Sequence, residues 1–423
     1  MSVDVSDVAA VAEDVESFRT RAREWIRGNL GPFRPETAMG LRSVPAEEEL
    51  AAVAYDRQLQ RKVYDAGFAG IAIPREYGGQ GLTAAHQRAF NEELAGYECA
   101  TRFQIPTMCP CAAVLLDFGT EEQKIRHIPA MLRGEEIWMQ FLSEPSGGSD
   151  VAGALTSAVR DGDEWVLNGS KVWTTGAWWS DWALCLARTN WDVPKHRGLS
   201  VFILPIKQSG VDVHQIEMLN GAKDFCQEFL TDVRVPDTDR VGAVDDGWTV
   251  VTRWMFHERT LFNSPYVTYP QGQVHTVADA SPADIARDAG VLDDPRARDL
   301  IGEARTLDVV GDALMQRIAG GMRAGRISDQ SAAIGRLYRG IAGTRTATIK
   351  FDIAGPDAAA WSDDDGGISQ AGNGFLMRQT ACIGGGTTEM ARNVISERVL
   401  GFPREQLPDR NVPFREVPRG GSR

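Results

Sequence analysis

The chain has 423 residues, of which 43% are hydrophobic, and its formal net charge is −13. This length and apolar content suffice for large buried cores in two or three structural domains. The acidic charge argues against nucleic acid or an anionic membrane surface as a general partner, because both repel it. No apolar run is long enough to span a bilayer, and residues 1–17 lack the basic and apolar segments of a targeting signal. A cytoplasmic location is expected.

The six cysteines are scattered along the chain, and none forms a Cys-x-x-Cys pair. The six histidines show no ligand spacing either. We therefore expect reduced thiols and no metal site.

Residues 1–137 are typical of a helical domain. Apolar residues at Val15, Phe18, Ala22 and Ile26 form one stripe at helical spacing. The stretch from Gly28 to Pro32 then ends the predicted helix. The glycines and prolines of residues 66–81 predict an irregular break between further helical segments.

From residue 138 to 243 the pattern favours β-structure. Asp161-Gly162 and Asn168-Gly169 separate short runs rich in Val and Trp, which is a pattern typical of hairpin turns. Leu199 to Pro205 predicts a buried strand, and the alternation at 211–213 predicts a half-exposed one.

Residues 244–402 return to a helical pattern, with helices predicted over 248–262 and 300–322. The intervening 264–298 is rich in Pro, Asp and Gln and predicts a surface excursion. The tail, 403–423, is expected to pack loosely. The predicted order of domains is therefore helical, β-rich and helical, and the predicted fold class is α+β.

Glycine-rich nucleotide motifs do not explain the chain. No Gly-x-Gly-x-x-Gly follows a predicted strand, and the run Gly384 to Thr387 lacks the lysine of a phosphate-binding loop. A nicotinamide enzyme of the usual fold is therefore disfavoured.

Two segments of the β region, however, form a specific pair of motifs: LSEPSGGSD at 142–150 and NGSKVWTTGA at 168–177. Together they resemble the paired signature of the acyl-CoA dehydrogenase family. Residues 68–81 and 384–401 resemble the family's N-terminal and C-terminal segments, so the resemblance covers nearly the whole chain except 264–298. It implies an N-terminal helical domain, a central β-barrel-like domain, and a C-terminal four-helix-bundle-type domain that mediates oligomerisation. It also implies an FAD enzyme that introduces an α,β double bond into an acyl thioester, with FAD between the β domain and the C-terminal helices.

The resemblance also implies the residues that contact FAD. A flavin ring is flat and apolar with hydrogen-bonding edges, and it needs an apolar face and short hydroxyls at its rim. Trp173 would supply the face, Ser143 and Thr175 the hydroxyls, and Gly148 a close backbone approach. The full set of implied contacts is Gln140, Leu142, Ser143, Gly148, Ser149, Trp173, Thr175, Thr387 and Glu389. The alternative is that Trp173 belongs to the strand core and Ser149 to a turn.

The position of the catalytic base departs from the common family pattern. The reaction removes a proton α to the thioester carbonyl, which requires a carboxylate in a dry setting and hydrogen bonds to the carbonyl oxygen. In much of the family a Glu stands immediately before the Gly-Thr of the C-terminal signature, where this chain has Gly385. A minority carries the base on a helix after the β domain, one residue before an Arg. Glu258, followed by Arg259, occupies that place and is the predicted base; the backbone N–H of Gly385 is the predicted donor to the thioester oxygen.

The predicted substrate-binding residues are Ser149, Phe256, Glu258, Arg259 and Gly386. Arg259 orients the substrate or the base, or it forms a structural salt bridge; His257 is expected to serve packing or to lie on the surface. Because Gly384 and Gly385 carry no side chains, a wide or branched acyl group is expected.

The implied partners are an acyl-CoA or carrier-bound acyl thioester, an electron-transfer flavoprotein or similar acceptor, and further copies of the chain in a homodimer or homotetramer. The Arg-x-x-Phe-Gly motif, which supplies an FAD contact in many members, is not found in 265–288. A hetero-oligomer with a related chain is therefore an alternative. Two other functions stay open: a two-component flavin monooxygenase of the same fold, and a non-catalytic partner subunit.

Overall fold

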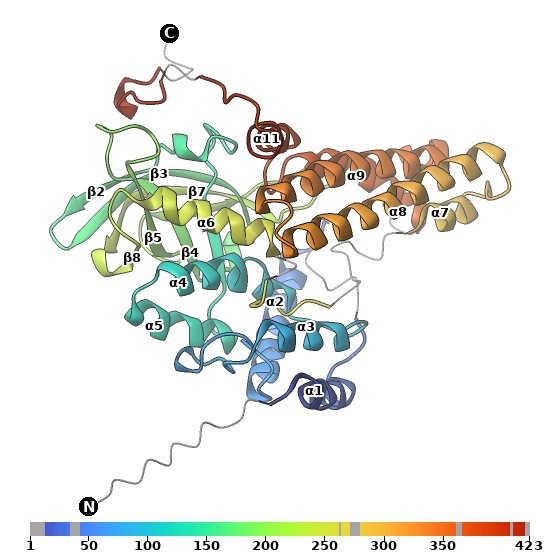
Figure 1. Ribbon diagram of the computed structural model, residues 1–423, viewed down its shortest axis with the longest axis horizontal. Helices are drawn as coiled ribbons and strands as arrows, with labels where there is room; N and C mark the ends of the chain where they lie inside the picture. Colours follow the sequence, from blue (N-terminus) through green and yellow to red (C-terminus); the bar gives the residue numbers. More distant parts are fainter. Residues whose placement is uncertain are drawn as a thin grey trace, which may run out of the picture.

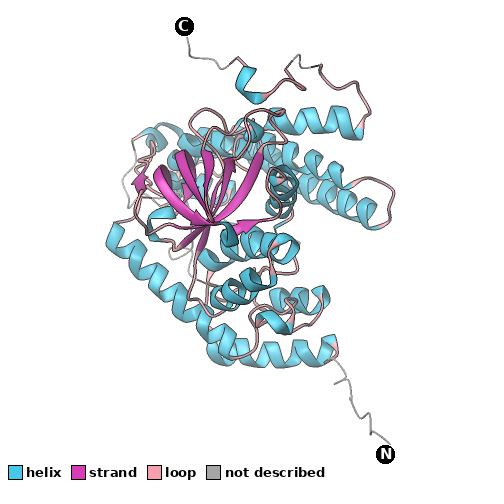
Figure 2. Cartoon of the chain, turned by 90° about the vertical axis from the view of Figure 1, so that its left-hand side faces the viewer, coloured by secondary structure: helices cyan, strands magenta, loops and turns pink. Residues whose placement is uncertain are grey.

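In the computed structural model, a sheet domain lies between two helical domains in chain order, and in space it lies beside both of them (Figures 1 and 2). The structure describes residues 13–33, 43–261, 264–270, 280–360, 366–406 and 409–418. Across these ranges, no helix combines the length and apolarity that crossing a bilayer requires.

The N-terminal domain follows from apolar stripes of the predicted kind. Phe18, Ala22 and Ile26 are fully buried on one face of the first helix, and the carboxylate of Asp14 caps its N-terminus by accepting from two backbone N–H groups. The helices are α1 (Val15–Asn29), α2 (Ala46–Asp65), α3 (Ala84–Glu93), α4 (Ala113–Phe118) and α5 (Glu121–Leu132), with a π-helical segment η3 (Phe103–Ala112) before α4.

The central domain is one mixed sheet. Its strands are β1 (Trp138–Phe141), β2 (Ser157–Asp161), β3 (Glu164–Thr175), β4 (Trp182–Arg188), β5 (Leu199–Pro205), β6 (Val211–Gln215), β7 (Phe225–Pro236) and β8 (Arg240–Val241). They run in the order β6-β7-β3-β2-β4-β5-β8, and β1 pairs in parallel with β4. Within the described residues β6 and β8 do not pair with each other, so the barrel-like sheet is open.

The two predicted hairpin turns have different outcomes. Asp161-Gly162 does connect β2 to β3, because Asp161 pairs with Glu164. Asn168-Gly169 is not a turn; it lies inside β3, at a shift in the register with β7. Gly169 is needed there for a close approach, since a Cβ at this position would lie 2.5 Å from Oγ1 of Thr156.

The C-terminal domain is helical, as predicted. It comprises α6 (Gly247–Arg259), α7 (Pro282–Asp288), α8 (Pro295–Arg323), α9 (Ala332–Ala354), α10 (Gly367–Met377) and α11 (Thr388–Val394), together with a short 3-10 segment, η8 (Asp329–Ser331). The long pair α8 and α9 extends away from the sheet (Figure 1). The surface excursion expected at 264–298 is wrong for the described part, because Val267, Ile285 and Ala286 are buried.

The expectation of a loosely packed tail is also wrong for residues 409–418. Phe414 is buried against the central domain, stacked on Trp191 at 5.6 Å and covered by the guanidinium of Arg188 at 3.7 Å. The N–H of Phe414 donates to the carbonyl of Val193 at 2.9 Å. One aromatic side chain therefore anchors a segment whose Pro/Arg-rich composition suggested none.

The interior of the sheet contains charged side chains. Lys171 of β3 and Glu228 of β7 are paired across the two strands, and both are fully buried. Oγ1 of Thr174 donates to Oε2 of Glu228 at 3.0 Å. Burial raises the pKa of Glu228 to about 8, so this carboxyl is protonated at neutral pH.

The buried proton of Glu228 makes stability depend on pH. An unfolded Glu loses its proton near pH 4.5, whereas folded Glu228 keeps it to about pH 8. The free energy of unfolding should therefore fall as pH rises through this window, by on the order of a few kcal/mol at ~1.4 kcal/mol per unit. We predict that Glu228→Gln removes this loss. The free energy of unfolding of the variant should therefore increase relative to that of the wild type as pH rises to about 8, and the difference should then stay constant. Denaturant unfolding from pH 5 to 9 measures it, with surface Glu164→Gln as control; a pH-independent difference would contradict the prediction.

Candidate active site

The two signature segments of the sequence lie side by side in the structure. The N–H of Val172 donates to the carbonyl of Ser143 at 3.0 Å, and Oγ1 of Thr174 lies 3.3 Å from the carbonyl oxygen of Gln140. The ammonium of Lys171 donates to the carbonyl of Leu142 at 3.3 Å. Strand β3 thus fixes the backbone that leaves β1.

Glu144 is the centre of this arrangement, and sequence reasoning assigned it no role. Its carboxylate accepts from Lys171 at 2.8 Å and from the N–H groups of Leu155 at 2.6 Å and Thr156 at 3.0 Å. Burial alone would raise the pKa of Glu144, but the charge of Lys171 and these hydrogen bonds hold it below its ordinary value. The available signal was a Glu three residues after the end of a strand that is apolar apart from Gln140, together with a Lys inside another strand.

Trp173 is turned out of the sheet. It lies at a register shift between β3 and β7, its φ is +66°, and it is 56% exposed, while Val172 and Thr174 on either side are buried. A left-handed conformation is costly for a bulky residue and tends to occur at functional sites. The ring packs edge-on against Phe225 at 5.8 Å, which leaves an aromatic surface available to a ligand.

The surroundings of Trp173 fit a flat cofactor ring with polar edges. Thr175 follows it at the end of β3, half-buried, and Ser143 lies on the neighbouring segment. Gly148 approaches Ser143 so closely that a Cβ would stand 3.4 Å from its Oγ. An aromatic surface, two hydroxyls and a glycine are the groups that a flavin requires. Leu142 is half-buried, and Ser149 is exposed directly after Gly148.

Glu258 stands in the last turn of α6 and lies beside Gly385, although the two are far apart in sequence. A Cβ on Gly385 would lie 3.8 Å from Oε1 of Glu258. Burial raises the pKa of Glu258, and the charge of Arg259 offsets this only in part. A partly dry carboxylate next to a residue without a side chain is an arrangement that can accept a proton from a bound molecule.

Three contacts fix the helix that carries Glu258. Nε2 of His257 lies 2.8 Å from Oδ2 of Asp117, and Nε of Arg253 donates to the same oxygen at 2.5 Å. The buried indole of Trp254 donates to Oε1 of Gln140. His257 is buried and packs in this anchor, in line with its expected packing role, whereas sequence reasoning did not single out Asp117. In this structure the side chain of Gln140 serves the same anchor.

The other predicted residues of α6 are less buried than this anchor. The half-buried ring of Phe256 lies under the guanidinium of Arg253 at 4.7 Å. Arg259 is exposed at the helix end. Both remain accessible to a bound molecule.

The C-terminal signature forms a glycine loop followed by α11. Gly385 and Gly386 have φ of +68° and +92° and are exposed. Oγ1 of Thr387 caps α11 by accepting from the N–H of Met390 at 3.1 Å. Glu389 lies exposed in the first helical turn, where Arg392 donates to it at 3.1 Å. These polar groups therefore surround an open helix N-terminus.

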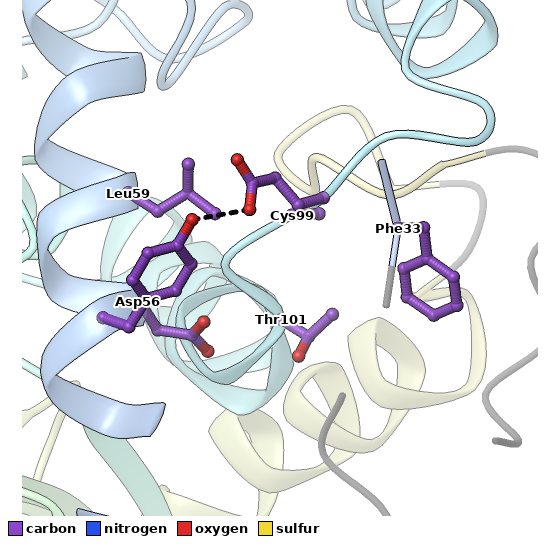
Figure 3. Close-up of a pocket in the computed structure, with 7 residues that line it drawn as sticks. Phe33, Asp56, Leu59, Cys99 and Thr101 are labelled. Carbon is purple, nitrogen blue, oxygen red and sulfur yellow. Dashed lines mark hydrogen bonds between the residues drawn. The ribbon is translucent and has the colours of Figure 1, made fainter. Parts of the chain in front are cut away.

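A hollow in the N-terminal domain is separate from this arrangement (Figure 3). It lies between α2 and the segment 98–101, and the hydroxyl of Tyr55 donates to Glu98 across it at 2.6 Å. None of the predicted site residues lines it. It therefore does not replace the site around Glu258.

Comparisons with known proteins agree with this geometry. The family model for the acyl-CoA dehydrogenase N-terminal domain matches residues 12–135, and that for the middle domain matches residues 140–233. Acyl-CoA dehydrogenase IpdE1 of Mycobacterium tuberculosis is 33% identical over 396 residues, covering 93% of this chain and 99% of the relative.

Solved structures share the fold. "Tcur3481-Tcur3483 steroid ACAD" has a TM-score of 0.70 at 24% identity, covering 92% of this chain and 98% of that one. The ChsE4-ChsE5 complex from Mycobacterium tuberculosis has a TM-score of 0.68 at 26% identity, covering 94% and 100%. The fold is that of the acyl-CoA dehydrogenases. The chain belongs to the acyl-CoA dehydrogenase family, which confirms the resemblance of its motifs.

The pair Lys171–Glu144 allows a direct test of how the site is held. We predict that Lys171→Met lowers the free energy of unfolding by about 3–5 kcal/mol, because it leaves a buried carboxylate without its cation. The double variant Lys171→Met/Glu144→Gln should be more stable than the single one, because the unpaired charge is gone. Denaturant unfolding of the four proteins in the cycle measures the coupling; strictly additive effects would show that the pair does not hold the two segments.

Proposed function

We propose that the protein catalyses the FAD-dependent α,β-dehydrogenation of an acyl-CoA or carrier-bound acyl thioester. The observation that carries the proposal is the position of the Glu258 carboxylate beside Gly385. FAD, when bound, would accept the hydride that leaves the β carbon. The residues that would hold it are Gln140, Leu142, Ser143, Gly148, Ser149, Trp173 and Thr175 from the central domain, with Thr387 and Glu389 from the C-terminal loop.

In this proposal the chain's own residues perform the proton chemistry. The partly dry carboxylate of Glu258 takes the proton from the α carbon. The backbone N–H of Gly385 donates to the thioester oxygen, which gathers negative charge as that proton leaves. Phe256, Arg259, Ser149 and Gly386 would contact the substrate. A flavin monooxygenase needs no carboxylate for α-deprotonation, so the burial of Glu258 favours the dehydrogenase.

The proposed substrate is a bulky or branched acyl thioester. Gly384, Gly385 and Gly386 leave the approach to Glu258 without side chains. Many family members have larger side chains at the positions of Gly384 and Gly385. The glycines therefore leave space there for the acyl group.

We further propose that a second chain completes the assembly, and that electrons pass to an electron-transfer flavoprotein or similar acceptor. Large apolar side chains are exposed on α8 and α9 and in the segments on either side of α11: Val309, Val310, Ile341, Ile383, Leu400 and Phe402. Apolar exposure of this extent marks an interface between chains. The related ChsE4-ChsE5 complex contains two different chains. It supports a hetero-oligomer as an alternative to the homo-oligomer that is common in the family.

Glu258→Gln tests the base. We expect turnover of the preferred thioester to fall about 10²–10⁴-fold with little change in its binding, because the amide cannot take a proton. Exposed Glu122→Gln serves as the matched control. An unchanged rate in the complete assembly would assign this chain to a non-catalytic role.

The same base predicts a pH profile. Because burial raises the pKa of Glu258, kcat/KM should decline as pH falls through a value above that of an ordinary Glu. Arg259→Met removes a charge that lowers this pKa, so the declining limb should move to higher pH. Steady-state rates from pH 5 to 9 measure it, and an acidic limb that stays in place in Arg259→Met would contradict the assignment.

A series of acyl-CoAs of increasing width tests the substrate class. The purified chain, alone and with a candidate partner chain, is mixed anaerobically with each thioester while its visible spectrum is recorded. We expect bleaching of a bound flavin to be fastest with bulky or ring-bearing acyl groups, because the glycine loop leaves room beside Glu258. A clear preference for short straight chains would contradict the proposed width.

A further inference from the structure

One face of α9 holds the glycine loop of the site. Arg336, Gly340 and Thr344 are spaced four residues apart, so they share this face. Oγ1 of Thr344 lies 3.2 Å from the carbonyl oxygen of Arg378, and Sγ of Cys382 lies 3.5 Å from that of Gly340. A Cβ on Gly340 would stand 2.7 Å from Thr388, so this glycine permits the close approach of α11.

Arg336 forms two hydrogen bonds with the loop. Its Nη1 donates to the carbonyl of Ala381 and its Nη2 to the carbonyl of Gly384, both at 2.8 Å. Burial and the charge of Arg339 lower the pKa of Arg336. Among the described residues no carboxylate lies within ion-pair distance of this guanidinium. Its hydrogen-bonding capacity is directed to backbone carbonyls instead.

The hydrogen bond from Arg336 to the carbonyl of Gly384 determines the direction of the Gly385 N–H. The carbonyl of Gly384 and the N–H of Gly385 belong to one planar peptide unit, and in a trans unit they point in opposite directions. Since the carbonyl points to Arg336 on α9, the N–H of Gly385 leaves the loop on the opposite side. Within the described part of the chain this N–H has no hydrogen-bond acceptor, and the Glu258 carboxylate lies beside the same residue.

Three consecutive glycines would not hold this direction unaided. Glycine has the greatest conformational freedom of any residue, and Gly385 and Gly386 both have positive φ. A donor that stabilises developing charge must be oriented before the reaction, otherwise its ordering costs free energy during the reaction. The planar guanidinium of Arg336, carried by the long helix α9, supplies that orientation.

We infer that Arg336 is a positioning residue that aims the Gly385 N–H at the thioester carbonyl without touching the substrate itself. The inference rests on the proposed function. It adds α9 to a site otherwise built from the central sheet, α6 and the glycine loop before α11.

The test separates proton abstraction from oxidation. A thioester with sulfur in place of its β carbon keeps its α hydrogens but has no β hydride to lose. With the holoenzyme in D₂O, Glu258 takes the α proton and returns a deuteron, and proton NMR measures the rate of this exchange. We expect Arg336→Gln to slow the exchange about 10–100-fold, less than the loss of a whole oxyanion donor, while the analogue's dissociation constant stays within about twofold. Arg336→Lys, which has a point charge in place of the fork, should give an intermediate rate.

Arg345 provides the matched control, because it is on the same helix but pairs with Glu303 at 2.6 Å. Arg345→Gln should leave the exchange unchanged. An exchange rate in Arg336→Gln equal to that of the wild type would overturn the inference. A loss of analogue binding as large as the loss of exchange would also overturn it, because it would indicate general disruption of the loop. If the wild type itself exchanged no α proton with any analogue, the proposed function would fail, and that result is distinct from the other two.

Discussion

The ion pair between Lys171 and Glu144 is the interaction on which the cofactor side of the site depends. Both side chains are buried, at 0% and 5% exposure, and such burial is tolerated only because each charge has several partners. The pair draws the loop after β1 onto β3, where the backbone of Ser143 bonds to Val172. With Lys171 and Thr174 directed inward, the register shift turns Trp173 out to the surface. The exposed aromatic side chain is thus a consequence of charges buried beneath it.

Glu258 and the Gly385 amide are held in place by other contacts. Asp117 holds α6 through His257 and Arg253, and Gln140 holds it through Trp254, so Glu258 is fixed relative to the N-terminal and central domains. The glycine loop is held by α9 instead. The distance between the carboxylate and the Gly385 amide therefore depends on how α8 and α9 pack against the rest of the molecule. Apolar side chains on these helices are exposed in the single chain, so the proposed assembly with a second chain would bear directly on that distance.

Fold class, the order of helical and sheet regions, and family membership were predictable because they rest on long periodic patterns and on several spaced motifs. Asn168-Gly169 was misread as a turn because a dipeptide does not reveal a cross-strand contact such as that with Thr156. The burial of Phe414 depends on Trp191 and Arg188, which are distant in sequence. Glu144, Asp117 and Arg336 were missed for the same reason: their importance comes from the backbone groups and charges around them, which only tertiary structure brings together. Glu258 was singled out as the predicted base because Gly385 has no side chain to take a proton, which directed attention to another carboxylate.

The position of the base and the composition of the loop constrain each other. A side chain at 385 would begin 3.8 Å from the Glu258 carboxylate, so a second carboxylate there would face the first in a dry setting. Like charges at that distance raise each other's pKa and crowd the space a substrate must enter. A base on α6 is therefore compatible with glycine at 385. Removing the side chain, however, also removes the steric restraint that would fix the neighbouring amide. The guanidinium of Arg336 supplies a restraint from the other side of the loop through its two hydrogen bonds. The proposed base, the glycine run and the arginine therefore depend on one another.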